Sequence, residues 1–461
     1  MRFSKRNIVR AAVLLIVFAL GASLLACSRQ DYVTPELPDG YEVNPTGKIK
    51  ASFYLRSGTE SEIAIDKWIK VYNEQYPNVK VKKDIIEWSQ FTVQIAAGDI
   101  GDVFFTGNVT CAEVVTKYKA AMPLDAYVEN LNIDVQQVYT SIYDGGIYNG
   151  LLYVVPSDIT RSVFLVNVSA LREAGLDKPK NDWTWDDLVN TYCPALHKVN
   201  PDGSLAQVGI FVECYGEALP LEFFFEGWGG KLVDTVNKKT HFYSDEKVVE
   251  GITQIIDLIR KGYATTTGLR GEIGAIHANL RDPQDYGFKF AHHGGMLWQD
   301  RIKDKLSYNE LGLEMDVVCP PLTPVRYIPG GGFGYFVYSK TRNPDAAATF
   351  ALTLLTYDGQ VAFNSIVGGG IPTRKDVGLT DVWRLPFDQS EYNYDAYAVY
   401  PESVGGGGWR GTLPPELVEI VERYVHTFVV DHLNNVRDYK DTLSKIETLC
   451  NEKWAELYTE G

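Results

Sequence analysis

The sequence predicts an α/β protein built from two domains. Its 461 residues exceed what one small hydrophobic core organises, and domains of ordinary size favour two. The folded part opens with a β–α–β pattern, which is typical of a doubly wound parallel sheet. Ile49–Leu55 alternates as a strand does, apolar residues recur at helical spacing from Ile63 to Tyr72, and Val79–Val81 begins a second strand.

A second β-rich region follows near residue 150. Leu151–Val155 is an apolar run that Pro156 is expected to end, and Val163–Val166 is another. Because proline donates no hydrogen bond to a β ladder, Pro156 indicates a sheet edge or a point where the chain crosses between domains. Thr184, with Asp187 three residues later, predicts an N-cap and the start of a helix.

Later elements are predicted by periodicity and by glycine or proline at their ends. Strands are expected at Met315–Cys319 and at Tyr335–Tyr338, with the glycine run Gly330–Gly334 before the second. Helices are expected at Ser169–Ala174, Val248–Gly262, Pro344–Leu355, Glu416–Val429 and Leu433–Tyr458.

Charge and cysteine content exclude several function classes. The formal net charge of −15 argues against a nucleic-acid partner, because phosphate binding needs a basic face. Six cysteines show no C-x-x-C metal pair, and one of them, Cys27, is set apart by its position. The odd remainder gives no disulfide framework, and whether any of them pair is left open: Cys111, Cys193, Cys214, Cys319 and Cys450.

The N-terminus carries a targeting signal. Basic residues precede an apolar run, Ala11–Leu25, that is short for a membrane span. The run ends Leu24-Leu25-Ala26-Cys27, which looks like a lipobox, with residues 1–26 as signal peptide and Cys27 as the lipidated residue. The alternative is an ordinary anchor helix with a chance cysteine. Residues 27–47 are polar and proline-containing, as expected of a tether.

Motifs of catalysis are missing from the sequence. It contains no G-x-S-x-G elbow, P-loop, H-E-x-x-H or dinucleotide fingerprint. His292 and His293 are adjacent, so on a strand they would point to opposite faces, which is poor geometry for a metal pair. We therefore expect no metal, no cofactor and no catalysed reaction. A secreted glycosidase remains the enzyme alternative, since carboxylate separation is not readable from spacing.

The stretch from Gly150 to Leu188 resembles the extracellular solute-binding proteins of family 1, the sugar receptors of ABC importers. It departs from their pattern at Val166, where tyrosine is usual, and at Asp187, where glutamate is common. The matching residues, in order, are Gly150, Tyr153, Pro156, Asn167, Ala174, Gly175, Leu176, Pro179, Trp183, Thr184, Trp185, Asp186, Asp187 and Leu188. Further segments similar to the family are Tyr76–Val81, Gln94–Val103, Pro123–Val128, Gly294–Asp300, Pro344–Leu355 and Gly368–Thr373.

The resemblance implies a two-lobe fold of the type II periplasmic-binding-protein kind, each lobe a doubly wound sheet with helices. Three hinge crossings would join the lobes. Lobe 1 would comprise residues 48–158 and 317–357, and lobe 2 residues 159–316 and 358–461. The resemblance also implies a ligand cleft beside Ser157–Arg161, near the first crossing between the lobes.

Sugars are held by aromatic faces and by polar side chains that fix hydroxyl groups. Trp298 and Trp409 lie where the family often has stacking aromatics. Trp228 has packing as its equal alternative, whereas Trp183 and Trp185 are expected to pack. Asp158 and Arg161 have mutual pairing as their alternative. The predicted ligand-binding residues are Trp298, Trp409, Asp158, Arg161, Arg56, Glu60, Asn108 and Trp228.

The resemblance implies a lipid-anchored, extracytoplasmic substrate-binding component of an ABC importer. It would bind a carbohydrate, in our expectation an oligosaccharide, by hinge closure and deliver it to the permease subunits as a monomer. Two alternatives stay open: a surface glycan-binding lipoprotein without a permease, and the secreted glycosidase. Neither the sugar nor its linkage follows from the sequence.

Overall fold

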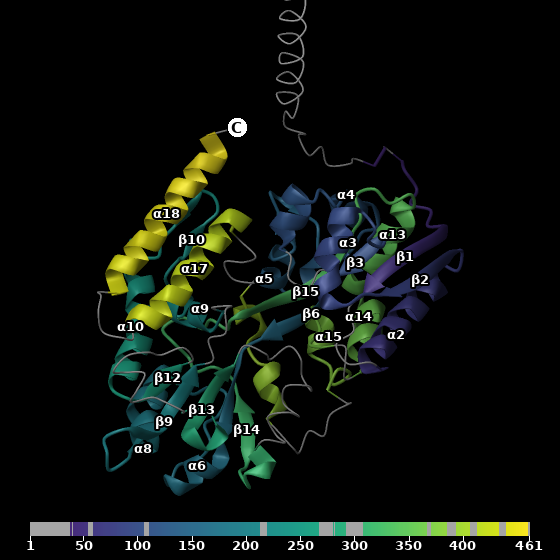
Figure 1. Cartoon of the computed structure of the whole chain (residues 1–461). Helices are drawn as coiled ribbons and strands as arrows, with labels where there is room; N and C mark the ends of the chain where they lie inside the picture. Colours follow the sequence, from purple (N-terminus) through teal and green to yellow (C-terminus); the bar gives the residue numbers. More distant parts are fainter. Residues whose placement is uncertain are drawn as a thin grey trace, which may run out of the picture. The chain divides into compact units, whose positions relative to one another are not determined.

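A computed structural model of the chain divides into two compact units, residues 1–42 and 43–461. The fold described below is that of the second unit (Figure 1). The structure describes residues 37–38, 40–53, 59–105, 110–212, 219–266, 280, 282–291, 308–366, 370–384, 393–405, 413–432 and 439–459.

The first lobe is built on a five-stranded sheet with the order β2-β1-β3-β15-β6. The strands β1 (Gly47–Phe53), β2 (Val79–Ile85) and β3 (Val103–Phe105) run parallel, as the opening β–α–β pattern predicts. β15 (Gly330–Val337) runs antiparallel between β3 and β6 (Val155–Arg161). The sheet therefore combines an N-terminal parallel half with two strands that come from distant parts of the chain.

Helix α2 (Thr59–Gln75) makes the crossover between β1 and β2 and buries its apolar face. Trp68 is fully buried, stacks on Phe350 at 4.1 Å between ring centroids and donates its indole N–H to the Phe350 carbonyl at 3.2 Å. Phe350 belongs to α13 (Pro344–Leu352), and α14 (Tyr357–Asn364) also packs on α2. These helices fix one face of the first sheet (Figure 1).

The second lobe holds a sheet with the order β12-β9-β13-β7-β14, with β8 paired to β9. β9 is parallel to β12 and β13, whereas β7 is antiparallel to both of its neighbours. The strand bounds are β7 Val163–Asn167, β8 Lys198–Val199, β9 Leu205–Val212, β12 Ala264–Thr266, β13 Tyr286–Ala291 and β14 Met315–Val318.

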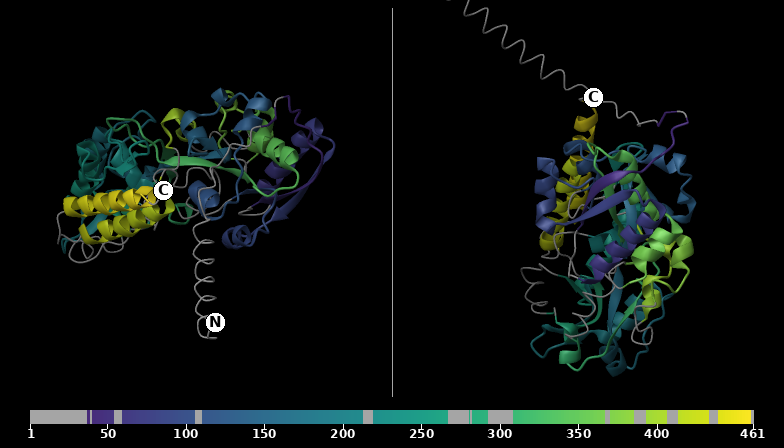
Figure 2. Two further views of the ribbon diagram at one scale, coloured as in Figure 1. Left: turned by 90° about the horizontal axis from the view of Figure 1, so that it is seen from above. Right: turned by 90° about the vertical axis from the view of Figure 1, so that its right-hand side faces the viewer.

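Long helices complete the second lobe. α10 (Glu246–Arg260) begins where the Asp245 side chain accepts from the Lys247 amide, and Gly262 follows it with φ of 72°, as the predicted stop requires. α9 (Leu219–Glu226) packs on α10. The last two helices, α17 (Pro415–His432) and α18 (Tyr439–Thr459), lie side by side in Figure 2 and pack against each other.

The shorter elements connect these. They are the helices α3 Phe91–Ala97, α4 Asp125–Asn130, α5 Thr140–Asp144, α6 Val168–Glu173, α7 Trp185–Asp187, α8 Cys193–Leu196 and α15 Lys375–Gly378, and the strands β4 Ile147–Tyr148, β5 Leu151–Leu152, β10 Val233–Asp234 and β11 Lys239–Thr240. The predicted cap is present, since the Thr184 hydroxyl accepts from the Asp187 amide and the Asp187 side chain accepts from the Thr184 amide.

Pro156 does not end a strand, contrary to the prediction. Leu151–Leu152 forms a small hairpin strand, while β6 begins at Val155 and runs through Pro156 to Arg161. The sheet tolerates this proline because β6 is its outermost strand, with β15 as its neighbour on one side. The expectation of an edge is therefore confirmed. The predicted strand at Tyr335 likewise starts earlier, because the glycine run belongs to β15 and a Cβ on Gly334 would lie 2.3 Å from the Val155 carbonyl oxygen.

The chain passes between the two sheets at defined places. β6 of the first sheet ends at Arg161 and β7 of the second begins at Val163, so Ser162 alone links them. The return runs from the end of β14 at Val318 to the start of β15 at Gly330. Because α14 packs on α2, the contacts favour a third crossing later than the predicted boundary at 357. The predicted lobe boundaries as a whole stay predictions.

Candidate functional site

A groove of about 690 Å³ separates the segment after β3 from the start of α17. One wall comes from the first lobe, at the carboxyl end of β3, where open α/β sheets place their ligand sites. The other wall comes from the last long helices of the second lobe. The lining residues are Thr110, Glu113, Thr116, Lys117, Pro415, Glu416, Val418, Glu419 and Glu422.

The first wall is a tightly hydrogen-bonded turn leading into the π-helix η2 (Glu113–Lys117). The Thr110 amide donates to Glu113 Oε2 and the Glu113 amide donates to Thr110 Oγ1, each at 3.2 Å. Lys117 Nζ lies 3.6 Å from Glu113 Oε1. Val114 and Val115 are buried against the first lobe, so the polar side of this turn is the one left for the groove.

The second wall is a row of carboxylates. Glu416, Glu419 and Glu422 are spaced three residues apart at the start of α17, which places them along one side of the helix. Leu417 and Val421 on the other side are fully buried in the core of the second lobe. Carboxylate oxygens accept hydrogen bonds, so this wall suits a ligand rich in hydroxyl or amino groups.

Asp158 lies on the half-exposed face of β6, together with Thr160. The Ser157 hydroxyl donates to Asp158 Oδ1 at 2.6 Å. Burial raises the pKa of this carboxyl to about 7, against the lowering effect of the Ser157 hydrogen bond. A carboxyl group with that pKa switches between hydrogen-bond donor and acceptor near neutral pH.

Arg161 lies on the opposite, buried face of β6 and is 1% exposed. Its guanidinium donates to the carbonyls of Val399 at 2.5 Å and Tyr397 at 3.4 Å, and to Cys319 Sγ at 3.4 Å. Burial lowers the pKa of this guanidinium. The structure therefore does not bring Asp158 and Arg161 together, either as a pair or on one face of the strand. It points Arg161 into the protein interior.

Trp228 lies in the core of the second lobe and is 5% exposed. Its ring meets Trp185 edge-on at 5.4 Å between centroids and stacks near Phe224 at 6.3 Å. This placement favours packing, the alternative to ligand binding. Trp183 and Trp185, for which packing is predicted, are 5% and 6% exposed and belong to the same core.

The remaining predicted ligand residues, Trp298, Trp409, Arg56 and Asn108, lie outside the described residues, as does Cys27. The backbone of Glu60 lies in α2. In the chain, Asn108 stands two residues before Thr110, and Trp409 stands six residues before Pro415. Both groove walls therefore follow directly on segments that carry a predicted ligand residue.

Sequence reasoning missed the groove residues themselves. Glu416, Glu419 and Glu422 lie within the predicted helix Glu416–Val429, and their i, i+3, i+6 spacing opposite Leu417 and Val421 is the sequence signal that could have found them. A smaller hollow of about 380 Å³ is lined by the end of α2, the segment after α4 and the α13–α14 region, which all belong to the first lobe. No predicted site residue lines it.

Cysteine and metal chemistry are not evident in the part of the chain that the structure describes. Cys111, Cys193, Cys319 and Cys450 are free thiols there, and burial raises the pKa of Cys111 and Cys193 to about 12. The described residues contain no cluster of three or more His, Cys, Asp or Glu side chains that could hold a metal. Within the same residues, each helix is too short or too polar to cross a lipid bilayer.

Comparison with protein families finds one match. The sequence profile of the family described as bacterial extracellular solute-binding protein matches residues 57–268. The matched residues include the stretch from Gly150 to Leu188, so the resemblance drawn from the sequence motifs is confirmed.

Solved structures with the same fold match most of the length of this chain. A cyclic α-maltosyl-1,6-maltose binding protein from Arthrobacter globiformis has a TM-score of 0.69 at 17% identity, covering 89% of this chain and 99% of its own. The sugar-binding protein MalE from Xanthomonas citri gives 0.67 at 16% identity, covering 89% and 98%. An ABC substrate-binding protein from Listeria monocytogenes in complex with cycloalternan gives 0.64 at 17% identity, covering 89% and 99%. The predicted two-lobe fold is confirmed.

Proposed function

The chain has the two-lobe fold of the extracellular solute-binding proteins, and from this premise we propose that it is the substrate-binding component of an ABC importer for an oligosaccharide. The observation that carries the proposal is the groove between η2 and α17. It joins the carboxyl edge of the first sheet to the second lobe, so a ligand lying in it touches both. No reaction is catalysed; binding alone is the function.

The polar lining supports a sugar. The groove offers four carboxylates, two threonines and one lysine, which match the many hydroxyl groups of a carbohydrate. Trp298 and Trp409 would add apolar ring faces for stacking, and Arg56, Glu60 and Asn108 would add polar contacts. The structures of similar fold include a protein in complex with cycloalternan and a cyclic α-maltosyl-1,6-maltose binding protein.

Binding is proposed to act through lobe closure. Ligand that contacts both walls favours the closed state over the open one, and the permease would sense the closed form. Asp158, on the half-exposed face of the crossing strand, is proposed to accept a ligand hydroxyl. Cys27 is proposed to carry the lipid that anchors the protein on the outer face of the cell membrane.

Isothermal calorimetry against a panel of neutral oligosaccharides tests the proposal. We expect one sugar class to bind, and Trp298→Ala and Trp409→Ala each to weaken its binding by about tenfold or more, since aromatic stacking with buried area contributes about 1.5 kcal/mol or more. Trp183→Phe, in the core, serves as the control. Unchanged affinity in both alanine variants would remove these tryptophans from the site. Binding to none of the panel would remove the function.

Two alternative functions can be distinguished experimentally from that of an importer component. A glycan-binding lipoprotein without a permease would bind the same sugar but would not stimulate ATP hydrolysis by a reconstituted importer. A glycosidase would release product from the bound glycan. Labelling with a palmitate analogue tests the anchor: we expect label on the wild type and none on Cys27→Ala.

A further inference from the structure

Residues 393–405, here called the hinge strap, precede the segment with Trp409 and helix α17. The strap contains two short 3-10 helices, η8 (Tyr394–Tyr397) and η9 (Pro401–Ser403). It is held at its beginning, middle and end by residues from different parts of the chain. The attachments are to β14, to β6 and to residues 326–328, which lie in the second crossing, the segment between β14 and β15.

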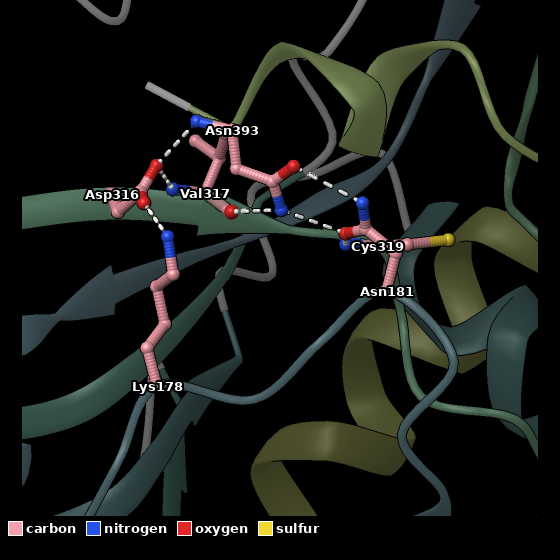
Figure 3. Close-up of polar contacts among 6 residues, drawn as sticks. All are labelled: Lys178, Asn181, Asp316, Val317, Cys319 and Asn393. Atoms are coloured by element: carbon pink, nitrogen blue, oxygen red, sulfur yellow. Dashed lines mark hydrogen bonds and ion pairs between the residues drawn. The ribbon is translucent and has the colours of Figure 1, made fainter. Parts of the chain in front are cut away.

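The beginning of the strap is attached to β14 of the second sheet (Figure 3). The Asn393 amide donates to Asp316 Oδ1 at 2.8 Å, and the Asn393 side chain donates to the Val317 carbonyl at 3.0 Å. The same side chain exchanges hydrogen bonds with Asn181 at 2.8 and 3.1 Å. Asp316 also forms an ion pair with Lys178. Asn393 is therefore fixed to the second lobe.

The middle of the strap is attached to the crossing strand β6. Arg161 donates to the Val399 carbonyl at 2.5 Å and the Tyr397 carbonyl at 3.4 Å. The second attachment is Arg326, whose guanidinium lies 3.7 Å from the centroid of the Tyr400 ring. Tyr400 has φ of 57° and ψ of 46°, a left-handed conformation that is unfavourable for a residue with a side chain. Arg326 thus covers the one strained residue of the strap.

The end of the strap pairs with the second crossing. The Ile328 amide donates to the Ser403 carbonyl and the Gly405 amide donates to the Ile328 carbonyl, both at 2.9 Å. A Cβ on Gly405 would lie 2.5 Å from the Tyr327 hydroxyl. That hydroxyl donates to Glu222 Oε2 of α9 at 3.2 Å. Segment 326–328 therefore contacts the strap along three consecutive residues.

Placing the two guanidinium groups here costs free energy. Arg161 Nε and Arg326 Nη1 are sealed from solvent without a hydrogen-bond partner in the described part of the chain. The two like charges also act on each other, since the charge of Arg326 contributes to lowering the pKa of Arg161. Buried charges kept at such a cost, beside a strained backbone, are typical of functional positions.

We infer that Arg161 and Arg326 are positioning residues that hold the hinge strap across both crossings and thereby set how far apart the two groove walls stand. The strap is fixed to β14 of the second sheet at Asn393, and β6 belongs to the first sheet, so the Arg161 contact with the strap links the two lobes. The inference concerns the ligand-free protein, and it extends the proposed lobe closure by naming what controls it.

Pulsed electron–electron resonance on the full chain tests this directly. A keto amino acid at Thr116 and another at Glu419 would carry nitroxide labels through hydroxylamine chemistry, which spares the cysteines. Both residues line the groove from opposite walls. The variants are Arg161→Lys, which cannot keep all three contacts, and Arg326→Gln. Arg172→Gln is the matched control, because Arg172 is exposed and pairs only at the surface with Glu314.

We expect the label-to-label distance distribution of both test variants to shift or broaden, with the open-to-closed ratio changing by about tenfold, as loss of a hydrogen bond to a charged group predicts. The control should match the wild type. Lower melting temperatures with an unchanged distribution would overturn the inference, because a purely structural role predicts that result. If Arg161→Lys does not fold, Arg326→Gln at half-buried Arg326 decides. Failure of the sugar panel would leave this result standing, so the two proposals fail separately.

Discussion

The hydroxyl of Ser157 donates to the carboxylate of its neighbour Asp158 across 2.6 Å, on the strand where the chain first leaves the first sheet. Adjacent residues of a strand point to opposite faces, so the hydroxyl reaches around the strand to the carboxylate, whose pKa is raised by burial. Gly370 lies close on the other side: a Cβ there would be 2.8 Å from Asp158 Oδ2. The carboxylate thus occupies a narrow place between the crossing strand and the segment 370–371.

The pKa of Asp158 predicts a pH-dependent stability. The folded pKa of about 7 lies above the ordinary value of 3.8, so between these values the folded protein binds more protons than the unfolded one. Stability should therefore fall as pH rises through this window. We expect the melting temperature of the wild type, relative to Asp158→Asn, to decrease from about pH 5 to about pH 8. A constant difference between the two proteins across this range would contradict the shifted pKa.

Substitutions of Trp228 distinguish a packing role from contact with the ligand. Because its ring is almost wholly buried among Trp185 and Phe224, Trp228→Ala should lower the free energy of unfolding by about 3–5 kcal/mol. Trp228→Phe keeps part of the packing and should cost less. Denaturant unfolding measures both. A variant that keeps full stability but loses sugar affinity would show instead that the ring contacts ligand.

The acidic wall of α17 should govern affinity. Replacing Glu416, Glu419 and Glu422 together by glutamine removes three charged acceptors from the groove. We expect binding of the sugar found by calorimetry to weaken by about tenfold or more, since a hydrogen bond to a charged group contributes about 1.5–3 kcal/mol. Glu452→Gln on exposed α18 is the control. Equal affinity of triple variant and control would place the ligand elsewhere.

The capping box at the start of α7 should stabilise the second lobe measurably. Thr184→Ala removes the acceptor for the Asp187 amide and should reduce the free energy of unfolding by about 1 kcal/mol. Thr184→Ser retains the hydroxyl and should behave almost as the wild type. Urea denaturation measures the difference in the free energy of unfolding, from the midpoints of curves with equal slope. If the serine variant loses as much as the alanine variant, the methyl group and not the cap is what matters.

Local chemistry made much of the fold predictable. Thr184 and Asp187 predict their cap because the pattern is contained in four residues, and Gly262 predicts the end of α10 for the same reason. Pro156 was misread, because a proline inside an edge strand and one that ends a strand look alike until the neighbouring strand is known. The glycine run is predicted to precede the strand at Tyr335, whereas it belongs to β15, which needs small residues to pass close to β6.

The site was less predictable because its walls come from distant segments. Asp158 and Arg161 are three residues apart, yet they lie on opposite faces of β6 and contact different parts of the protein. The partners of Arg161 are backbone carbonyls more than two hundred residues later, which no local pattern reveals. Glu416 and Glu113 line one groove for the same reason: only the assembled lobes bring residues so far apart in the chain to one place.

Ser162 is the whole length of chain between β6 and β7. Strands alternate their side chains, so inserting a single amino acid there would exchange inward and outward positions on one strand relative to the other. Either the buried guanidinium of Arg161 would turn to the partly exposed face of β6, or the residues of β7, which are buried on both faces, would exchange the neighbours against which they pack. Natural variants of this protein should therefore vary in length almost anywhere on the surface before they do so at this link.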